Sequence, residues 1–134
     1  MPTNYPTPEE KQAAAALYDT TKLLPFSHNW NNKLYCEYFT TIRLHNPQKY
    51  SIGKFLTCTM KGEEMGLVRV ESVRTFPLRN LTAHMAGMDM GMTAADGRRL
   101  LERFYQNSND ATQFDFVLLR KLTAWQPPSN TVKP

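Results

Sequence analysis

The segment from Tyr38 to Lys54 places a hydroxyl group and a guanidinium group close together in the sequence. It contains Thr40-Thr41-Ile42-Arg43, whose β-branched residues are typical of a strand. Because side chains alternate along a strand, Thr41 and Arg43 should point to the same face. A threonine hydroxyl beside the planar fork of N–H donors of an arginine suits the binding of a phosphate group.

Other residues around this segment have the side chains that a nucleic-acid ligand requires. Cations contact phosphate groups, and aromatic rings stack on bases. The candidate ligand-binding residues are Arg43, Lys49, Tyr50, Lys54, Arg74, Trp30 and Tyr105. Trp30 has a second interpretation, because packing in the core is the more common role of a tryptophan.

The distribution of charge favours the same class of ligand. The stretch from Arg43 to Arg79 has more basic than acidic residues, and this excess accounts for the net charge of +4. A basic region of this kind suits a phosphate-bearing ligand, although an ordinary solvated surface has similar charges.

Length and composition predict one domain with its own core, since the chain has 134 residues and a hydrophobic content of 41%. No apolar run is long enough to span a bilayer, and the first residues lack a signal-peptide pattern. We therefore expect a soluble, cytoplasmic protein without a membrane partner.

Cys36 and Cys58 fall in predicted strands, where reduced thiols are expected and a disulfide between neighbouring strands is the alternative.

The chain alternates between helical and extended patterns. A helix begins at Thr7-Pro8 and ends before Pro25, and a loop follows over Phe26–Asn32. The predicted strands are Leu34–Leu44, Phe55–Met60, Gly66–Thr75 and Phe114–Leu122, and further helices are predicted at Leu78–Met85 and Thr93–Tyr105. The second and third strands form a hairpin, in which Val68 and Val70 face the core.

The stretch TTIRLHNPQKYSIGK resembles the opening of an ASCH domain, a small member of the PUA-like fold superfamily. Such domains begin with a strand containing Thr-x-Arg, continue through a loop and place a glycine before the second strand. Thr41, Arg43 and Gly53 follow this order, and the later elements agree with it over roughly residues 33–122.

The resemblance implies an α+β fold, a small PUA-like mixed β-barrel with flanking helices and a cleft for RNA or a nucleoside. Residues 1–32 would then be an added N-terminal helix and loop packed on the domain. Residues 33–122 would form the barrel, and residues 123–134 a C-terminal tail.

The resemblance also implies a possible set of catalytic residues, because some ASCH domains are hydrolases. Their amidohydrolase group has Lys-x-x-Thr-x-Arg on the first strand and a glutamate before the flanking helix, for activation of a nucleophile and for proton transfer. Thr41 and Arg43 match this pattern, whereas Tyr38 occupies the lysine position and the glutamate position falls at Met90, next to Asp89. The candidate catalytic residues are therefore Thr41, Tyr38 and Asp89.

No cofactor or metal ion is expected. The three histidines lack metal-ligand spacing, and no glycine-rich nucleotide-binding motif is present. The segment Met85–Met92 is rich in methionine, whose thioether binds Cu(I), but methionine packing over a cleft is the more common role.

Three functions remain open. The first is a domain that binds RNA, a nucleotide or a modified nucleoside. The second is a hydrolase, either a ribonuclease or an amidohydrolase of acylated nucleosides, in which Thr41 is the nucleophile or orients water. The third is a module that binds a protein partner through the N-terminal helix and the methionine-rich segment, since a scaffold can lose its ancestral ligand.

Overall fold

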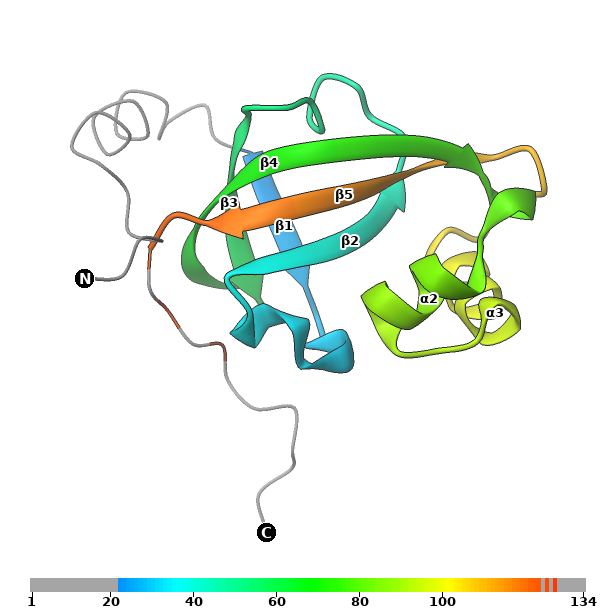
Figure 1. Cartoon of the computed structure of the whole chain (residues 1–134), viewed down its shortest axis with the longest axis horizontal. Helices are drawn as coiled ribbons and strands as arrows, with labels where there is room; N and C mark the ends of the chain where they lie inside the picture. Colours follow the sequence, from blue (N-terminus) through cyan, green and yellow to red (C-terminus); the bar gives the residue numbers. More distant parts are fainter. Residues whose placement is uncertain (1–21, 124, 126, 128–134) are drawn as a thin grey trace, which may run out of the picture.

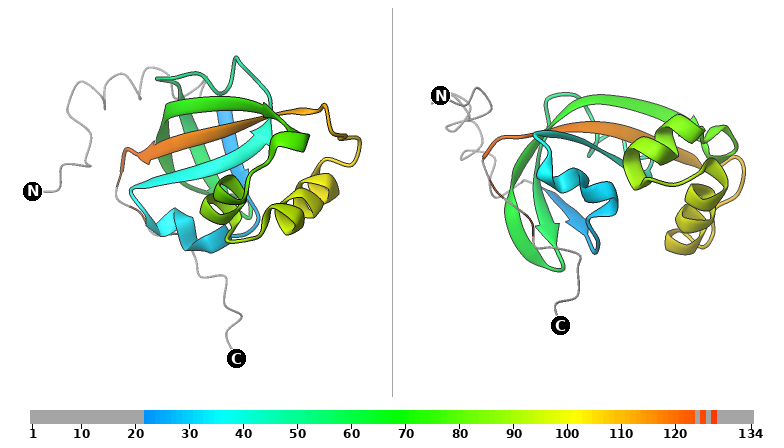
Figure 2. Two further views of the ribbon diagram at one scale, coloured as in Figure 1. Left: turned by 45° about the vertical axis from the view of Figure 1, so that its right-hand side comes forward. Right: turned by 60° about the horizontal axis from the view of Figure 1, so that its bottom comes forward.

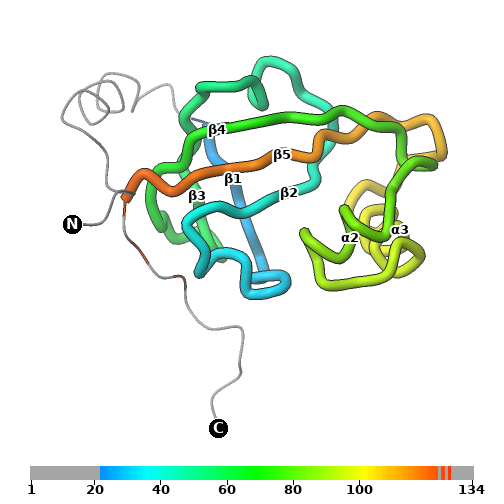
Figure 3. The backbone as a smooth tube through the Cα atoms, viewed as in Figure 1, coloured from blue at the N-terminus to red at the C-terminus, as the bar shows by residue number. Residues whose placement is uncertain are grey.

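One five-stranded mixed sheet curls into a half-barrel around which the other elements are arranged (Figure 1). In chain order its strands are β1 (Lys22–Phe26), β2 (Tyr38–Leu44), β3 (Phe55–Met60), β4 (Glu63–Pro77) and β5 (Gln113–Lys121). The spatial order is β1-β3-β4-β5-β2, in which β1 is parallel to β3 and the other neighbours are antiparallel. The computed structural model describes residues 22–123, 125 and 127, and Figure 3 traces their backbone.

The helices are inserted at two places in this sheet. The 3₁₀ helix η2 (Trp30–Tyr35) connects β1 to β2. Between β4 and β5 lie η3 (Leu78–Asn80), α2 (Ala83–Met90) and α3 (Ala94–Phe104). Figure 2 shows α2 and α3 together at one end of the curved sheet, and α2 also contacts β2 and η2. The fold is thus α+β, consistent with a small PUA-like barrel.

Threonine side chains set the beginnings of both α-helices. The Oγ1 atom of Thr82 accepts a hydrogen bond of 3.1 Å from the Met85 amide, and Thr93 Oγ1 accepts one of 3.1 Å from the Asp96 amide. Each bond satisfies an amide that has no partner within its own helix. Gly91 ends α2 with a φ of 67°, a left-handed conformation that glycine adopts without steric cost.

Two hydrophobic cores lie on opposite faces of the sheet. The curve of the half-barrel encloses the first, which includes Leu24, Val68, Val70, Val117 and Leu119. The second lies between the outer face and the helices, and its members include Ile42, Phe76, Met85, Leu101 and Phe114. Because side chains alternate along β5, this one strand contributes to both cores.

The long strand β4 allows the sheet to curl. Its first part pairs with β3 and its second part pairs with β5. The register of the β3–β4 pairing shifts between Cys58 and Thr59 of β3. The register of the β4–β5 pairing shifts between Val70 and Ser72 of β4. Such bulges bend a strand and increase its twist. The curl leaves β1 and β2 as the two edges of the sheet, with an opening between them.

The structure corrects the predicted end of the N-terminal helix. Residues 22–24 were expected to be helical, but Lys22–Phe26 is strand β1. Leu24 and Phe26 alternate with exposed residues and fill the first core. Pro25 cannot donate a ladder hydrogen bond, but an edge strand tolerates a proline because one of its two sides has no partner strand. The remainder of the predicted helix, residues 8–21, lies outside the described residues.

Two further boundaries were predicted wrongly. The strand expected from Leu34 begins only at Tyr38, because Trp30–Tyr35 forms η2. The helix expected over Leu78–Met85 is divided into η3 and α2, and α2 extends through most of the methionine-rich segment. Met85 and Met90 of this segment are buried in the second core, whereas Met88 is exposed.

Several other expectations are confirmed. Strand β3 has the predicted bounds, Thr93 caps α3, and Val68 and Val70 are fully buried. Both cysteines are free thiols. The prediction that both lie in strands is correct for Cys58, which is buried in β3, and wrong for Cys36, which is exposed and lies between η2 and β2.

Among the described residues, no helix is long and apolar enough to cross a membrane.

The contact between α2 and α3 predicts how glycine substitutions affect stability. A Cβ atom at Gly97 would lie 3.0 Å from Ala86 Cβ and 3.0 Å from Met90 Cε, whereas at Gly87 the nearest atom would be 4.0 Å away. Gly97→Val should therefore lower the free energy of unfolding by about 1–3 kcal/mol through overpacking. Denaturant titration measures this change. Gly87→Val is the matched control, and an equal loss for the two variants would contradict close packing at Gly97.

Candidate functional site

A pocket of about 260 Å³ occupies the opening between the edge strands β1 and β2. Its walls come from the end of β1, from η2, from the middle of β2, and from α2 and α3. The polar residues that line it are Ser27, Lys33, Thr41, Arg43 and Asp89. The aromatic residues that line it are Phe26, Trp30, Phe104 and Tyr105. The pocket thus combines ionisable groups with ring faces.

Arg43 links the two edges of the half-barrel. From β2, its Nη2 atom donates a hydrogen bond of 2.7 Å to the Pro25 carbonyl oxygen of β1. Its Nε atom donates a bond of 2.8 Å to Thr41 Oγ1, and its guanidinium carbon lies 4.7 Å from the centre of the Phe26 ring. Thr41 and Arg43 therefore share one face, as alternation requires, and both line the pocket.

A buried ion pair lies deeper in the pocket. Lys33 Nζ and Asp89 Oδ1 are 2.7 Å apart, and the two side chains are each 6% exposed. The same Asp89 oxygen accepts a hydrogen bond of 3.1 Å from Thr40 Oγ1. Burial lowers the pKa of Lys33, and the nearby charge of Arg43 lowers it further, while the Asp89 carboxylate opposes both effects.

The local conformation of η2 delivers Lys33 to this position. Asn31 and Asn32 have φ values of 59° and 53°, a left-handed conformation that asparagine tolerates better than most residues. Asn31 Nδ2 also donates to the carbonyl oxygens of Gly87 and Met88, at 3.2 and 3.3 Å, near the end of α2. The Gly87 carbonyl oxygen also accepts from the Gly91 amide at 3.0 Å. The two bonds of Asn31 thus fasten η2 to the end of the helix that carries Asp89.

Aromatic rings form the outer wall of the pocket. The ring of Trp30 is half-buried and packs against His28 at a centroid distance of 4.4 Å. Tyr105 meets Phe114 edge to face at 5.5 Å, and Phe104 is 54% exposed. Apolar walls with a few convergent polar groups are the usual composition of a small-molecule site.

The structure brings together five of the residues that the sequence singled out. Thr41, Arg43, Asp89, Trp30 and Tyr105 all line the pocket. Met90 also lines the pocket. It stands where the amidohydrolase group has its glutamate, so it presents a thioether there and not a carboxylate.

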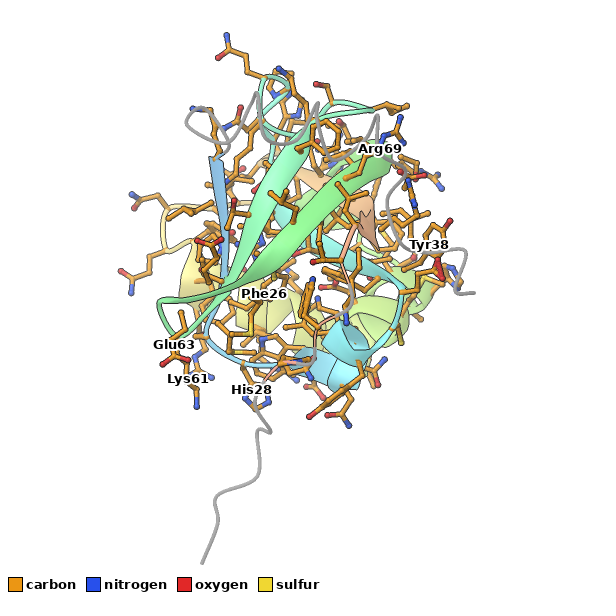
Figure 4. All side chains as sticks on the ribbon, turned by 90° about the vertical axis from the view of Figure 1, so that its left-hand side faces the viewer. Phe26, His28, Tyr38, Lys61, Glu63 and Arg69 are labelled. Atoms are coloured by element: carbon orange, nitrogen blue, oxygen red, sulfur yellow. The ribbon has the colours of Figure 1, made fainter. Side chains whose placement is uncertain are left out.

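The other candidates lie elsewhere. Tyr38 is 49% exposed and does not line the pocket, and Figure 4 shows it on the outside of the molecule, away from Phe26. Arg74 lines a separate open groove with Thr75 and Arg79. Lys54 is exposed. Lys49 and Tyr50 do not line the pocket either. Burial lowers the pKa of Lys49, and the charge of Arg43 lowers it further. Burial raises the pKa of Tyr50 to about 12, although the charge of Arg43 opposes this effect.

Lys33 was not found by sequence reasoning. The resemblance placed the lysine position at Tyr38 on the strand, whereas the structure supplies a lysine from the preceding 3₁₀ helix. The run of asparagines before Lys33 is the signal that could have indicated a left-handed turn there. Thr40, Phe26 and Phe104 also escaped notice, because their roles depend on how separate elements pack.

Comparison with known proteins identifies a relative in fold alone. No family model matches the chain, and no curated protein matches it. Among solved structures, protein EF3133 from Enterococcus faecalis V583, of family DUF984, is similar with a TM-score of 0.55 and 7% identity. The match covers 91% of this chain and 97% of that chain. At this identity the two proteins share an architecture, and architecture does not determine a ligand.

The geometry of the ion pair predicts a large effect on stability. Lys33→Met leaves the Asp89 carboxylate buried without its cation, which should cost about 3–5 kcal/mol. The double variant Lys33→Met/Asp89→Leu should recover most of this loss, because no uncompensated charge remains. Chemical denaturation of the single and double variants measures the coupling.

The exposed pair Arg99–Asp96 provides the matched control for this measurement. Arg99→Met should change stability by less than about 1 kcal/mol, as is usual for surface pairs. A Lys33→Met variant as stable as Arg99→Met would show that water reaches the Lys33–Asp89 pair.

Proposed function

We propose that the pocket binds one planar ligand of the size of a nucleoside, either free or as an unpaired residue of RNA. The observation that carries this proposal is the position of Trp30, Phe104 and Tyr105 on the same cavity as Arg43 and the Lys33–Asp89 pair. Rings that stack on a base and groups that bond to its edge are the two requirements for recognition of a single-stranded nucleotide.

The volume of the pocket supports a single unit. A pocket of about 260 Å³ lies just below the range of about 300–1,000 Å³ that is typical of drug-sized ligands. It is thus too small for a folded oligonucleotide and suited to one base with its sugar. An RNA strand would have to place one unstacked base in the pocket and leave its neighbours outside.

Asp89 offers an acceptor for such a ligand. Its Oδ1 atom accepts from Lys33 and Thr40, whereas Oδ2 has no hydrogen-bond partner among the described residues. An exocyclic amino group of a base is a donor that would match this oxygen.

Arg43 supplies the complementary donors. Two of its N–H groups bond to Thr41 and Pro25, and the others have no partner among the described residues. A base with adjacent donor and acceptor groups would pair with Asp89 and Arg43 together. The position of Thr41 and Arg43 in the pocket supports the resemblance to ASCH domains, on which the assignment to nucleosides and RNA also depends.

A second candidate function is hydrolysis of an acylated nucleoside or of RNA. It is favoured by the presence of Lys33 and Thr41 on one pocket, where burial lowers the pKa of Lys33 in the direction that a general base requires. For an acyl substrate, the Thr41 oxygen would attack the acyl carbon while Lys33 takes the hydroxyl proton. The amine would leave with a proton returned by Lys33, and water would then release the acyl group from Thr41.

Binding is tested by titration with the four common nucleosides and with short single-stranded RNA. Trp30→Ala should weaken the affinity by roughly 5- to 150-fold, because stacking on an aromatic ring contributes about 1–3 kcal/mol per base. A Trp125→Phe background leaves Trp30 as the single tryptophan, so its fluorescence reports ligand binding directly.

The matched control for Trp30→Ala is Tyr38→Ala, which removes an exposed ring outside the pocket. The Tyr38→Ala variant should bind the nucleosides and RNA with the same affinity as the unmodified protein. The proposal fails if no nucleoside or RNA binds at low salt, or if the two variants bind equally well.

Hydrolysis is tested with acetylcytidine and single-stranded RNA as substrates. Thr41→Val and Lys33→Met should abolish activity, and Thr41→Ser should retain part of it because the hydroxyl remains. The rate should rise with pH through the lowered pKa of Lys33, since the neutral amine is the base. Turnover that persists in Thr41→Val would exclude this mechanism.

A further inference from the structure

One amine lines the pocket from within the protein. Lys33 lies on the wall of the cavity of about 260 Å³, yet its side chain is only 6% exposed. A lysine that is desolvated in a pocket is one of the arrangements in which proteins use an amine as a nucleophile toward a carbonyl group. Lys33 therefore has the position that such chemistry requires.

A second cation lies close to this amine. Lys33 Nζ lies 5.3 Å from the centre of the Phe26 ring, and the guanidinium carbon of Arg43 lies 4.7 Å from the same centre. A neighbouring positive charge favours the neutral amine, and only the neutral amine has the electron pair that attacks a carbonyl carbon. The lowered pKa of Lys33, with burial as its largest cause and the charge of Arg43 as a smaller one, agrees with this placement.

A carboxylate is in place to take the proton of this amine. Asp89 Oδ1 is 2.7 Å from Lys33 Nζ, and it also accepts a hydrogen bond of 3.1 Å from Thr40 Oγ1. Asp89 lines the same pocket as Lys33. A proton can therefore move between the amine, the carboxylate and an oxygen atom of a bound molecule within the pocket.

The other buried lysine of the described residues lacks these surroundings. Lys121 is 4% exposed, and burial lowers its pKa as it does for Lys33. Its Nζ atom donates to the Trp125 carbonyl oxygen at 3.1 Å and lies 4.0 Å from the centre of the Trp125 ring. Lys121 does not line the pocket, and it forms no ion pair with a carboxylate among the described residues. Burial alone thus does not distinguish Lys33, whereas the carboxylate and the cavity do.

We propose that Lys33 forms a protonated imine with a ring-bearing aldehyde or ketone, and that Asp89 transfers the proton. Asp89 takes a proton from the Lys33 ammonium, and the neutral amine attacks the carbonyl carbon. A proton then moves from nitrogen to the former carbonyl oxygen. Asp89 returns its proton to the resulting hydroxyl group, which leaves as water while the carbon–nitrogen double bond forms. Ammonium and carbonyl compound thus give a positively charged imine and one water molecule, without an oxidant or a reductant.

The walls of the pocket specify the class of carbonyl compound. Its aromatic residues suit a ring, and its volume admits a single small ring system. The positive charge of the imine replaces that of the ammonium, so the buried Asp89 carboxylate keeps a cationic partner after the reaction. This activity goes beyond the proposed function, because it requires Lys33 and the pocket but neither a base nor a sugar.

Reductive trapping on the full chain tests the proposal. The protein is incubated with benzaldehyde and sodium cyanoborohydride, whose hydride converts the imine to a stable secondary amine. Mass spectrometry of the digested protein then locates the modified lysines. Lys33 should react roughly 10-fold or more faster than Lys121 and the exposed Lys22, because it alone of the three has an acid–base group beside it among the described residues. Modification of Lys33 no faster than that of Lys22 would overturn the proposal.

Substitution of Asp89 separates proton transfer from simple pairing. Asp89→Asn removes the proton acceptor, so modification of Lys33 should slow by about 100-fold or more, as is typical for a lost acid–base group. A carboxylate that only holds the ammonium in place would give the opposite result, because its loss frees the amine. An unchanged or a faster rate would therefore overturn the proposal.

The matched control is Asp96→Asn, which removes an exposed carboxylate paired with Arg99 and should leave the modification of Lys33 unchanged. Thermal unfolding of both variants verifies that they remain folded. The comparison of Lys33 with Lys22 and Lys121 in the unmodified chain needs no substitution, so it decides the proposal even if Asp89→Asn does not fold.

A second aldehyde tests the class of ligand. Propanal has no ring to place against the aromatic walls, so it should favour Lys33 over Lys22 less than benzaldehyde does. An equal preference for Lys33 with the two aldehydes would overturn the assignment to ring-bearing compounds. Failure of trapping would leave the nucleoside pocket of the proposed function standing, and failure of nucleoside binding would leave the trapping result unaffected.

Discussion

The hydrogen bond from Arg43 to the Pro25 carbonyl is the constraint on which the site depends. The edges of the half-barrel, β1 and β2, are not neighbours in the sheet, so no backbone ladder joins them. A side chain bridges the opening instead, with its guanidinium over the Phe26 ring. A backbone ladder at this place would fill the opening, whereas a single side chain leaves room for a pocket. The same residue therefore secures an exposed edge and presents donors to whatever enters the pocket.

The Lys33–Asp89 pair has a different physical role. Charges buried in this way seldom add stability in comparison with hydrophobic side chains of similar volume, because desolvation offsets the attraction between them. Its effect here is to determine position. The pair joins η2 to α2, and the bonds of Asn31 to the end of α2 hold the same two elements together.

Local sequence predicted those parts of the molecule that local interactions determine. The alternation that put Thr41 and Arg43 on one face, the Thr93 cap and the bounds of β3 all depend on residues close in the chain. Strand β1 depends on parallel pairing with β3, a distant segment, which overrides the helical tendency of the residues before it. Lys33 was missed for a related reason, since its position requires two left-handed asparagines and a helix end that only the folded chain provides.

The charge of Lys33 links the alternative functions to the nature of the ligand. Burial and the neighbouring Arg43 favour the neutral amine, which can accept a proton, whereas Asp89 favours the ammonium, which can only donate hydrogen bonds. A phosphate group bound to Arg43 would compensate the charge of that guanidinium and so weaken one of the two effects that lower the pKa of Lys33. An anionic nucleotide would therefore keep Lys33 charged and suit recognition. An uncharged acylated nucleoside would leave Lys33 closer to the neutral form that hydrolysis needs, so an anionic ligand would work against catalysis in the same pocket.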